Sequence, residues 1–334
     1  MGNKCACVDD CQESELVEKS NGVEKNGKEL PPLGQHVLPP LVSDASPASG
    51  SESVPVLLEN GLKYTGQWKG QLREGEGVLQ RPDGGRYEGQ FVADRAHGTG
   101  RLTHACGDVF DGQWCKDQSH GFGRFTHADG TSYEGQWVED LQEGYGVEQW
   151  PDGSRFAGNY LHGKKHGRGS FDWADGSAYN GEFRESVLHG SGEYKWADGR
   201  CYAGQWASNA FHGFGLMTWL DGRAYRGFYQ EDKKHGEGCF RWADSRQYSG
   251  QWQEGKQHGV GRHMSSAGKV RVGEWDTGRR TAWSSNERDV EVADNLLEAD
   301  PTGDHAGEVA MPEATAETEI ARDGMPKPIL PEMG

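Results

Sequence analysis

The sequence predicts an all-β fold: an elongated, single-layer antiparallel β-meander of about nine hairpins, with disordered N- and C-terminal tails. Three observations support this prediction. Aromatic residues recur every 23 residues from Tyr64 to Tyr248. The aromatic and glycine residues of each motif stand two positions apart, and Asp-Gly closes most repeats. A fixed period of this length is typical of repeat architectures. A spacing of two places residues on the same face of a strand.

The first strand of each repeat has the pattern aromatic-x-Gly-x-aromatic, beginning with Tyr64, Gly66 and Trp68. The first aromatic occurs nine times without a gap, and the Gly and the second aromatic continue to Gly273 and Trp275. The positions between them are polar, so the pattern indicates a sheet with one apolar face and one polar face.

The second strand begins at a Gly-x-Gly that occurs nine times, first at Gly75 and Gly77. We expect these glycines and Leu79 to share one face of the strand. A glycine beside aromatic residues leaves room for a ring from the neighbouring strand. The Asp-Gly pairs, such as Asp129-Gly130, predict the tight turns between strands, since such turns need positive φ angles.

Together these motifs resemble the MORN repeat (membrane occupation and recognition nexus). The resemblance covers roughly residues 60–278, in nine full copies and a tenth that keeps Gly273 and Trp275. The sequence departs from the family pattern at Cys106 and at Asp244-Ser245, where two of the Asp-Gly turns are altered. The resemblance implies a rod-like β-sheet that acts as a scaffold or adaptor at membranes, junctions, cytoskeletal structures or ciliary spokes. It implies protein binding and dimerisation more strongly than lipid binding.

Charge and composition divide the chain into three segments. Residues 1–60 (net charge −6) form an acidic tail with an N-terminal acylation signal, and 61–278 (net charge −3) form the repeat array. Residues 279–334 (net charge −8) form an acidic, mostly disordered tail, with a short helix expected around 286–298. An acidic chain without a basic stripe argues against nucleic-acid binding.

The first residues, MGNKCACVDD, carry a candidate lipidation signal. Gly2 is the acceptor position for N-myristoylation, although Ala6 stands where the pattern has Ser or Thr. A single myristoyl chain binds membranes only marginally. Cys5 and Cys7 are therefore the candidates for palmitoylation as a second anchor. An unmodified terminus with free thiols remains the alternative.

No feature of the sequence indicates an enzyme, and we expect no cofactor. Each tail is shorter than an ordinary catalytic domain, and the chain has no P-loop, kinase or zinc-protease motif. The Gly-x-Gly copies belong to strands and do not open a helix, so they are not nucleotide-binding fingerprints.

A histidine precedes seven of the nine Gly-x-Gly motifs: His97, His120, His166, His189, His212, His235 and His258. Equivalent residues of adjacent repeats are two strands, or about 9.5 Å, apart. Two of them therefore cannot share a metal ion, and we expect no metal site. One hypothesis is that their protonation makes partner or anionic-lipid binding sensitive to pH. The alternative is a structural role, with each ring over the neighbouring glycine backbone.

A second column contains Trp150, Trp173, Trp196, Trp219 and Trp242. A sheet needs a second layer to bury a face, so we expect an exposed aromatic face and interpret these tryptophans as its partner-binding part. The alternative is that they only pack against one another.

The functional interpretation is a non-enzymatic scaffold that tethers protein partners at a membrane or membrane-associated cytoskeleton. Its expected location is the cytosolic face of a membrane. One alternative is a ciliary or axonemal component similar to radial-spoke proteins, and a homodimer is a further expectation. The other alternative is a phosphoinositide-binding or lipid-kinase-associated regulatory module, which the nearly neutral centre disfavours, since headgroup binding needs clustered basic residues.

Overall fold

The computed structural model describes residues 55–58 and 61–289, which contain 22 β-strands in one sheet and no α-helix. The predicted fold class is therefore confirmed. The strands are β1 (Val56–Leu57), β2 (Lys63–Lys69), β3 (Leu72–Gln80), β4 (Arg86–Val92), β5 (Arg95–Thr103), β6 (Val109–Cys115), β7 (Gln118–Thr126), β8 (Ser132–Val138), β9 (Leu141–Gln149), β10 (Arg155–Leu161), β11 (Lys164–Asp172), β12 (Ala178–Arg184), β13 (Val187–Lys195), β14 (Cys201–Ala207), β15 (Ala210–Thr218), β16 (Ala224–Gln230), β17 (Lys233–Arg241), β18 (Gln247–Gln253), β19 (Lys256–Met264), β20 (Lys269–Asp276), β21 (Arg279–Trp283) and β22 (Arg288–Asp289).

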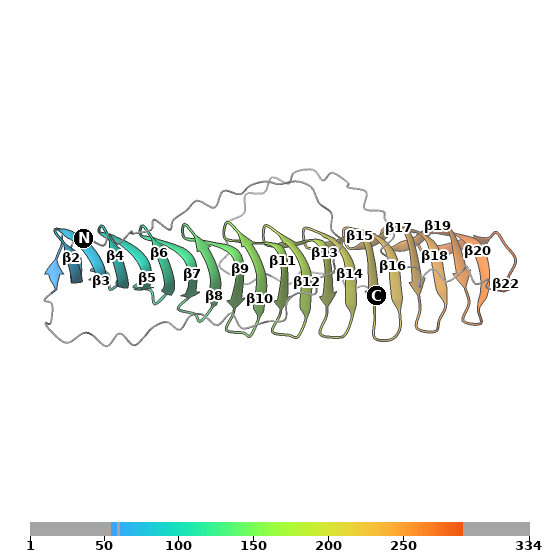
Figure 1. The fold of residues 1–334 in the computed structure, drawn as a ribbon. Helices are drawn as coiled ribbons and strands as arrows, with labels where there is room; N and C mark the ends of the chain where they lie inside the picture. Colours follow the sequence, from blue (N-terminus) through green and yellow to red (C-terminus); the bar gives the residue numbers. More distant parts are fainter. Residues whose placement is uncertain (1–54, 59–60, 290–334) are drawn as a thin grey trace, which may run out of the picture.

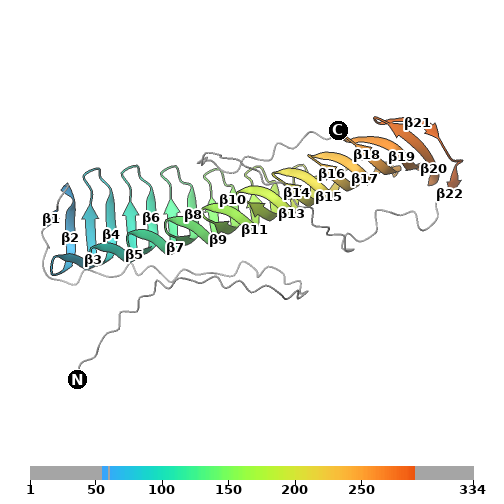
Figure 2. The same cartoon turned by 90° about the horizontal axis from the view of Figure 1, so that it is seen from above.

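The strands follow one another along an elongated array (Figure 1). From β1 to β21 each strand pairs antiparallel with the next, and β22 pairs with β20 beside β21. Figure 2 shows that the sheet twists along its length, as the handedness of strands requires. Strands β21 and β22 lie within the segment 279–334. Of the helix expected at 286–298 only the first four residues are described, and Arg288–Asp289 there form a strand.

Each nine-residue strand contains a β-bulge at the first glycine of Gly-x-Gly. Gly89 pairs with Gly100, but the next pair joins Phe91 to Ala96, and Gly98 between them has φ +66°. The expectation that Gly75 continues the face of Gly77 and Leu79 is therefore wrong, because Gly75 (φ +71°) occupies the equivalent bulge. A bulge bends its strand and increases local twist, and the strands in Figure 1 are visibly curved.

The tightest turns lie within each repeat and contain no Asp-Gly. Between β4 and β5 the two turn residues are Ala93 (φ +49°) and Asp94 (φ +72°), and Ser208 and Asn209 adopt the same conformation between β14 and β15. Positive φ at both positions is the signature of a type I′ hairpin turn. Asp and Asn tolerate this conformation because their short polar side chains bond locally.

The Asp-Gly pairs lie instead in five-residue loops that connect successive repeats, so their prediction as tight turns is wrong. In the loop from His127 to Thr131, the His127 amide donates to the Thr131 carbonyl at 2.8 Å. The Asp129 carboxylate accepts from the Thr131 amide at 2.8 Å, which is an Asx turn. Gly130 has φ +96°, so the glycine supplies positive φ in a longer loop.

The aromatic rings form a core within this single sheet. Tyr64, Tyr202 and Tyr225 have no exposed surface, and the second aromatic of the motif is buried from Phe91 onward. Tyr64 packs edge-on against Phe91 of the next repeat, with ring centroids 5.3 Å apart at 86°, and equivalent contacts continue to Tyr248 and Trp275. Edge-to-face pairs contribute roughly 0.5–1.5 kcal/mol each beyond their buried area. The prediction of an uncovered aromatic face is wrong, because each repeat's rings cover those of its neighbour.

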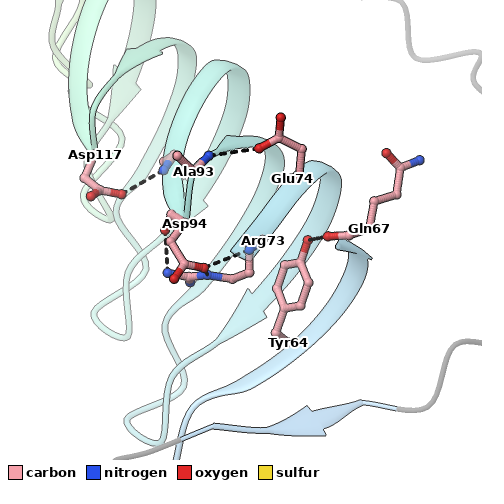
Figure 3. Close-up of polar contacts among 8 residues, drawn as sticks. Tyr64, Gln67, Arg73, Glu74, Ala93, Asp94 and Asp117 are labelled. Carbon is pink, nitrogen blue, oxygen red and sulfur yellow. Dashed lines mark hydrogen bonds and ion pairs between the residues drawn. The ribbon is translucent and has the colours of Figure 1, made fainter. Parts of the chain in front are cut away.

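The paired glycines allow this packing, as expected. Gly66 and Gly77 face each other across β2 and β3, and a Cβ atom on Gly77 would lie 2.4 Å from the Tyr64 hydroxyl. The ring therefore lies directly over the glycine backbone. The Tyr64 hydroxyl donates to the carbonyl of Gln67 at 2.9 Å, opposite the bulge (Figure 3). The bulge, the glycine and the tyrosine thus form one structural unit.

The tight turns also fasten each repeat to the preceding one. The Asp94 carboxylate accepts from the backbone amide and the guanidinium of Arg73, at 2.8 and 3.0 Å (Figure 3). These hydrogen bonds lower the pKa of Asp94, the backbone amide contributing most. Asp117 and Asn209 accept from the amides of Ala96 and Leu188 in the same way.

Candidate partner-binding surface

The predicted tryptophan column lies along the edge formed by the five-residue loops. Each tryptophan is the first residue of its loop, and the Trp196 amide donates to the Arg200 carbonyl at 3.0 Å. Trp173 and Trp219 are buried, whereas Trp150, Trp196 and Trp242 are half-buried and pack against the core. The column therefore combines packing with a partly exposed edge.

The tryptophans join the core through rings of the nine-residue strands. Trp196 lies 4.6 Å from the ring of Tyr194 and 6.1 Å from that of Phe211. Trp242 contacts Phe240 at 4.9 Å. Any loss of these indoles therefore affects stability as well as a docking surface.

An arginine lies over three of these rings. The guanidinium carbons of Arg200, Arg223 and Arg246 lie 5.0, 5.2 and 5.5 Å from the ring centroids of the tryptophans that open their loops. Each arginine is held by the aspartate two residues earlier, at 2.7–2.8 Å. Such exposed cation–π contacts contribute about 0.5–1 kcal/mol. The edge therefore offers planar guanidinium and indole groups, which are enriched at protein interfaces.

A notch of about 370 Å³ separates two of these loops. Its lining consists of Asp198, Arg200, Trp219, Leu220, Asp221 and Arg223. Leu220 is 80% exposed, where the loops beginning at Trp173, Trp196 and Trp242 have alanine. An exposed apolar side chain beside arginine and tryptophan is a suitable contact for a partner.

The seven predicted histidines are all half-buried, along the strands that carry the bulge. The Nδ1 atoms of His166 and His189 are buried and have no hydrogen-bond partner among residues 55–58 and 61–289, and His258 Nδ1 lies 3.7 Å from a carboxylate oxygen of Asp276. Burial, reinforced by Arg184, lowers the pKa of His189 below its ordinary value of 6.5. That histidine therefore contributes less positive charge near pH 6 than the pH-sensitive hypothesis assumes.

Within residues 55–58 and 61–289, no three His, Cys, Asp or Glu side chains are grouped as metal ligands. The same residues contain no helix long and apolar enough to cross a membrane. The candidate lipidation residues Gly2, Cys5 and Cys7 lie outside the described residues.

A glutamine stands between the Gly and the second aromatic in several repeats, as at Gln113 and Gln205, and it has a role that the sequence pattern did not reveal. The side-chain oxygen of Gln113 accepts from the Phe122 amide at 2.7 Å, and that of Gln205 accepts from the Phe214 amide at 3.0 Å. Each of these amides follows the bulge glycine, so the glutamine caps the bulge. Its regular position between Gly and the second aromatic was the only available signal.

Comparisons with known proteins agree with this architecture. The family model described as MORN repeat matches nine consecutive segments: 64–86, 87–109, 110–132, 133–155, 156–178, 179–199, 202–222, 225–245 and 248–269. A search of curated proteins found no match.

Among solved structures, one similar chain is the TCP domain of SAS-4 (dCPAP) of Drosophila melanogaster, in complex with a proline-rich motif of Ana2. It is 12% identical, with 60% of this chain and 98% of that chain covered and a TM-score of 0.30. Another is the wild-type TCP10 domain of Danio rerio CPAP in complex with a STIL peptide, at 15% identity, 70% and 99% coverage and a TM-score of 0.21. TM-scores this low carry no argument about fold or function. The family model, by contrast, matches more than half of the chain, and the protein belongs to the MORN-repeat family.

Proposed function

We propose that this protein is a non-enzymatic scaffold that holds protein partners at the cytosolic face of a membrane or at membrane-associated cytoskeleton. The observation that carries this proposal is the unbroken pairing of strands from β1 to β21, with one aromatic core along the array. Repeat proteins of this construction offer extended binding surfaces. MORN repeats are consistent with such a protein-binding scaffold.

The loop edge is the proposed binding surface. Trp150, Trp196 and Trp242 are accessible there, and arginines lie over the rings of Trp196 and Trp242. A flat partner surface can contact several of these equivalent positions together. The core rings are buried, so the partner contacts the outer edge of the array.

Membrane attachment rests on Gly2 with Cys5 or Cys7, since two acyl chains give stable anchoring where one does not. The test is membrane fractionation of the full chain and of Gly2→Ala, combined with capture of bound proteins. We expect Gly2→Ala to leave the membrane fraction and to keep its partners. If the variant stays in the same fraction as the wild type, the membrane tether is wrong and a ciliary or cytoskeletal role takes its place.

A further inference from the structure

Two lysines are buried on the aromatic face of the sheet, at equivalent positions of repeats that are 69 residues apart. Lys165 in β11 and Lys234 in β17 are each 8% exposed. Lysine is rarely buried to this degree without a partner. The partners of the two buried lysines can therefore be compared within one protein.

The first site is complete. The Lys165 ammonium lies 2.7 Å from a carboxylate oxygen of Glu148, and the Tyr160 hydroxyl donates to the same oxygen at 2.9 Å. The rings of Trp150 and Phe156 are each 5.1 Å from the ammonium nitrogen. The buried charge thus has both an acceptor and an aromatic surround.

The second site has the donors without the acceptor. Met217 stands where the first site has Glu148, and Tyr229 stands where it has Tyr160. The Tyr229 hydroxyl is buried without a hydrogen-bond partner among the described residues. The Lys234 ammonium is surrounded by rings, with Phe240 at 4.8 Å and Trp252 at 5.3 Å.

The charges around Lys234 do not supply the missing acceptor. Burial, with a further contribution from Arg223, lowers the pKa of Lys234 to about 8. Arg223 is itself paired with Asp221 at 2.8 Å, whereas no described carboxylate lies within ion-pair distance of Lys234. The site therefore has positive charge in excess.

The notch described above lies beside this site. Its Trp219 ring is 5.9 Å from the Lys234 ammonium and 5.2 Å from the Arg223 guanidinium carbon. Trp219 therefore belongs both to the ring surround of Lys234 and to the wall of the notch, which makes the exposed Leu220 side chain a neighbour of the cation site.

We infer that Lys234 is a subsite for an aspartate or glutamate side chain of a protein partner, and that the notch at Leu220 receives a neighbouring apolar side chain. This inference rests on the proposed scaffold function and adds the chemistry of the partner. The partner's carboxylate supplies to Lys234 what Glu148 supplies to Lys165. Removing either member of a buried charge pair across an interface weakens binding strongly, since the other charge is left uncompensated.

The test uses the full chain and two fluorescent libraries of short peptides. Both libraries have randomised apolar residues around a central position, which is Glu in one and Gln in the other. We expect the wild type to bind the Glu library at least about tenfold more tightly. Lys234→Met should abolish this preference. Met217→Glu should abolish it as well, because it restores an internal acceptor. Lys233→Met, at the exposed neighbouring position, should retain it.

Thermal unfolding of each variant shows whether it is folded. If Lys234→Met does not fold, the binding preference of Met217→Glu decides whether Lys234 is the subsite. No preference in the wild type, or a preference that survives in Lys234→Met or Met217→Glu, would overturn the inference. If the Glu library fails while partner capture depends on Trp196 and Trp242, the subsite is wrong and the scaffold function stands. If that dependence is also missing, the scaffold function is wrong too.

Discussion

Gly192→Ala tests whether the array depends on backbone space beneath its rings. Gly192 is the second glycine of its Gly-x-Gly and pairs with Gly181 across the sheet. A Cβ atom on Gly192 would lie 2.3 Å from the hydroxyl oxygen of Tyr179 and 2.5 Å from the adjoining ring carbon. Tyr179 is 1% exposed and packs edge-on against Phe183, so its ring has little room to move.

The expected cost is a balance of three terms. Forcing a methyl group into a well-packed site costs about 1–3 kcal/mol. Displacing the Tyr179 hydroxyl from the Glu182 carbonyl, to which it donates at 3.0 Å, costs about 1 kcal/mol. The lower entropy of the unfolded chain offsets about 0.4–1 kcal/mol. We therefore expect Gly192→Ala to lower the free energy of unfolding by about 1–3.5 kcal/mol.

The assay is urea unfolding of wild type, Gly192→Ala, Tyr179→Leu and the double variant, followed by tryptophan fluorescence. If the steric explanation is correct, Gly192→Ala costs much less in the Tyr179→Leu background, because the ring atoms are gone. Coupling of this kind between contacting residues is measurable as a double-mutant cycle. An equal cost in both backgrounds would refute the packing argument.

Three further predictions concern hydrogen bonding and charge. Tyr202→Phe should destabilise the array by about 1 kcal/mol in urea unfolding, since it removes the donor to the Gln205 carbonyl at 2.9 Å; an unchanged midpoint would contradict this role. The folded pKa of Asp94 is depressed below 3.8, so its carboxylate stabilises the fold above that pH and the stabilisation is lost as the pH falls through the folded value. Asp94→Asn should therefore be less stable than wild type at neutral pH and approach it in acid, and a gap independent of pH would count against the ion pair. For Lys234, a folded pKa of about 8 against the ordinary 10.5 means that the unfolded chain binds more protons between these values. Wild type should gain stability relative to Lys234→Met as the pH rises from 8 to 10.5, and a flat difference would show that the ring contacts keep Lys234 charged.

The repeat and its strands could be predicted because two periods coincide in the sequence. The 23-residue recurrence from Tyr64 to Tyr248 defines the units, and the spacing of two defines strands. The role of the second glycine also followed from local chemistry, since Gly77 must admit the Tyr64 ring. These features depend on neighbours one or two strands apart.

The turns and the bulge could not be placed from the same pattern. Ala93-Asp94 is an ordinary dipeptide in sequence, and only the structure shows positive φ at both residues. The familiar Asp-Gly signal drew the prediction to the wrong end of the hairpin. Gly75 and Gly77 are both glycines in one strand, so the sequence did not show which of them forms the bulge.

The burial of the aromatic face depended on curvature, which no local pattern reports. The rings of each repeat cover those of the next, but not to the same extent. Trp219 is buried, whereas Trp196 and Trp242 are half-buried. The unequal exposure follows from neighbouring side chains. The unmatched Lys234, in contrast, is visible in sequence once repeats are compared, because Met217 replaces the glutamate that serves Lys165.

The central claim, that the loop edge binds protein partners, is tested most directly by capture with the Trp196→Ala and Trp242→Ala double variant. Quantitative capture from cells compares this variant with wild type and with Gly192→Ala, which we expect to be destabilised and which lies in β13, outside the loop edge. The account predicts that the tryptophan variant loses many more partners than Gly192→Ala, even where Gly192→Ala is destabilised as much or more. If partner loss in both variants simply follows stability, the tryptophans are core residues alone and the proposed binding edge is contradicted.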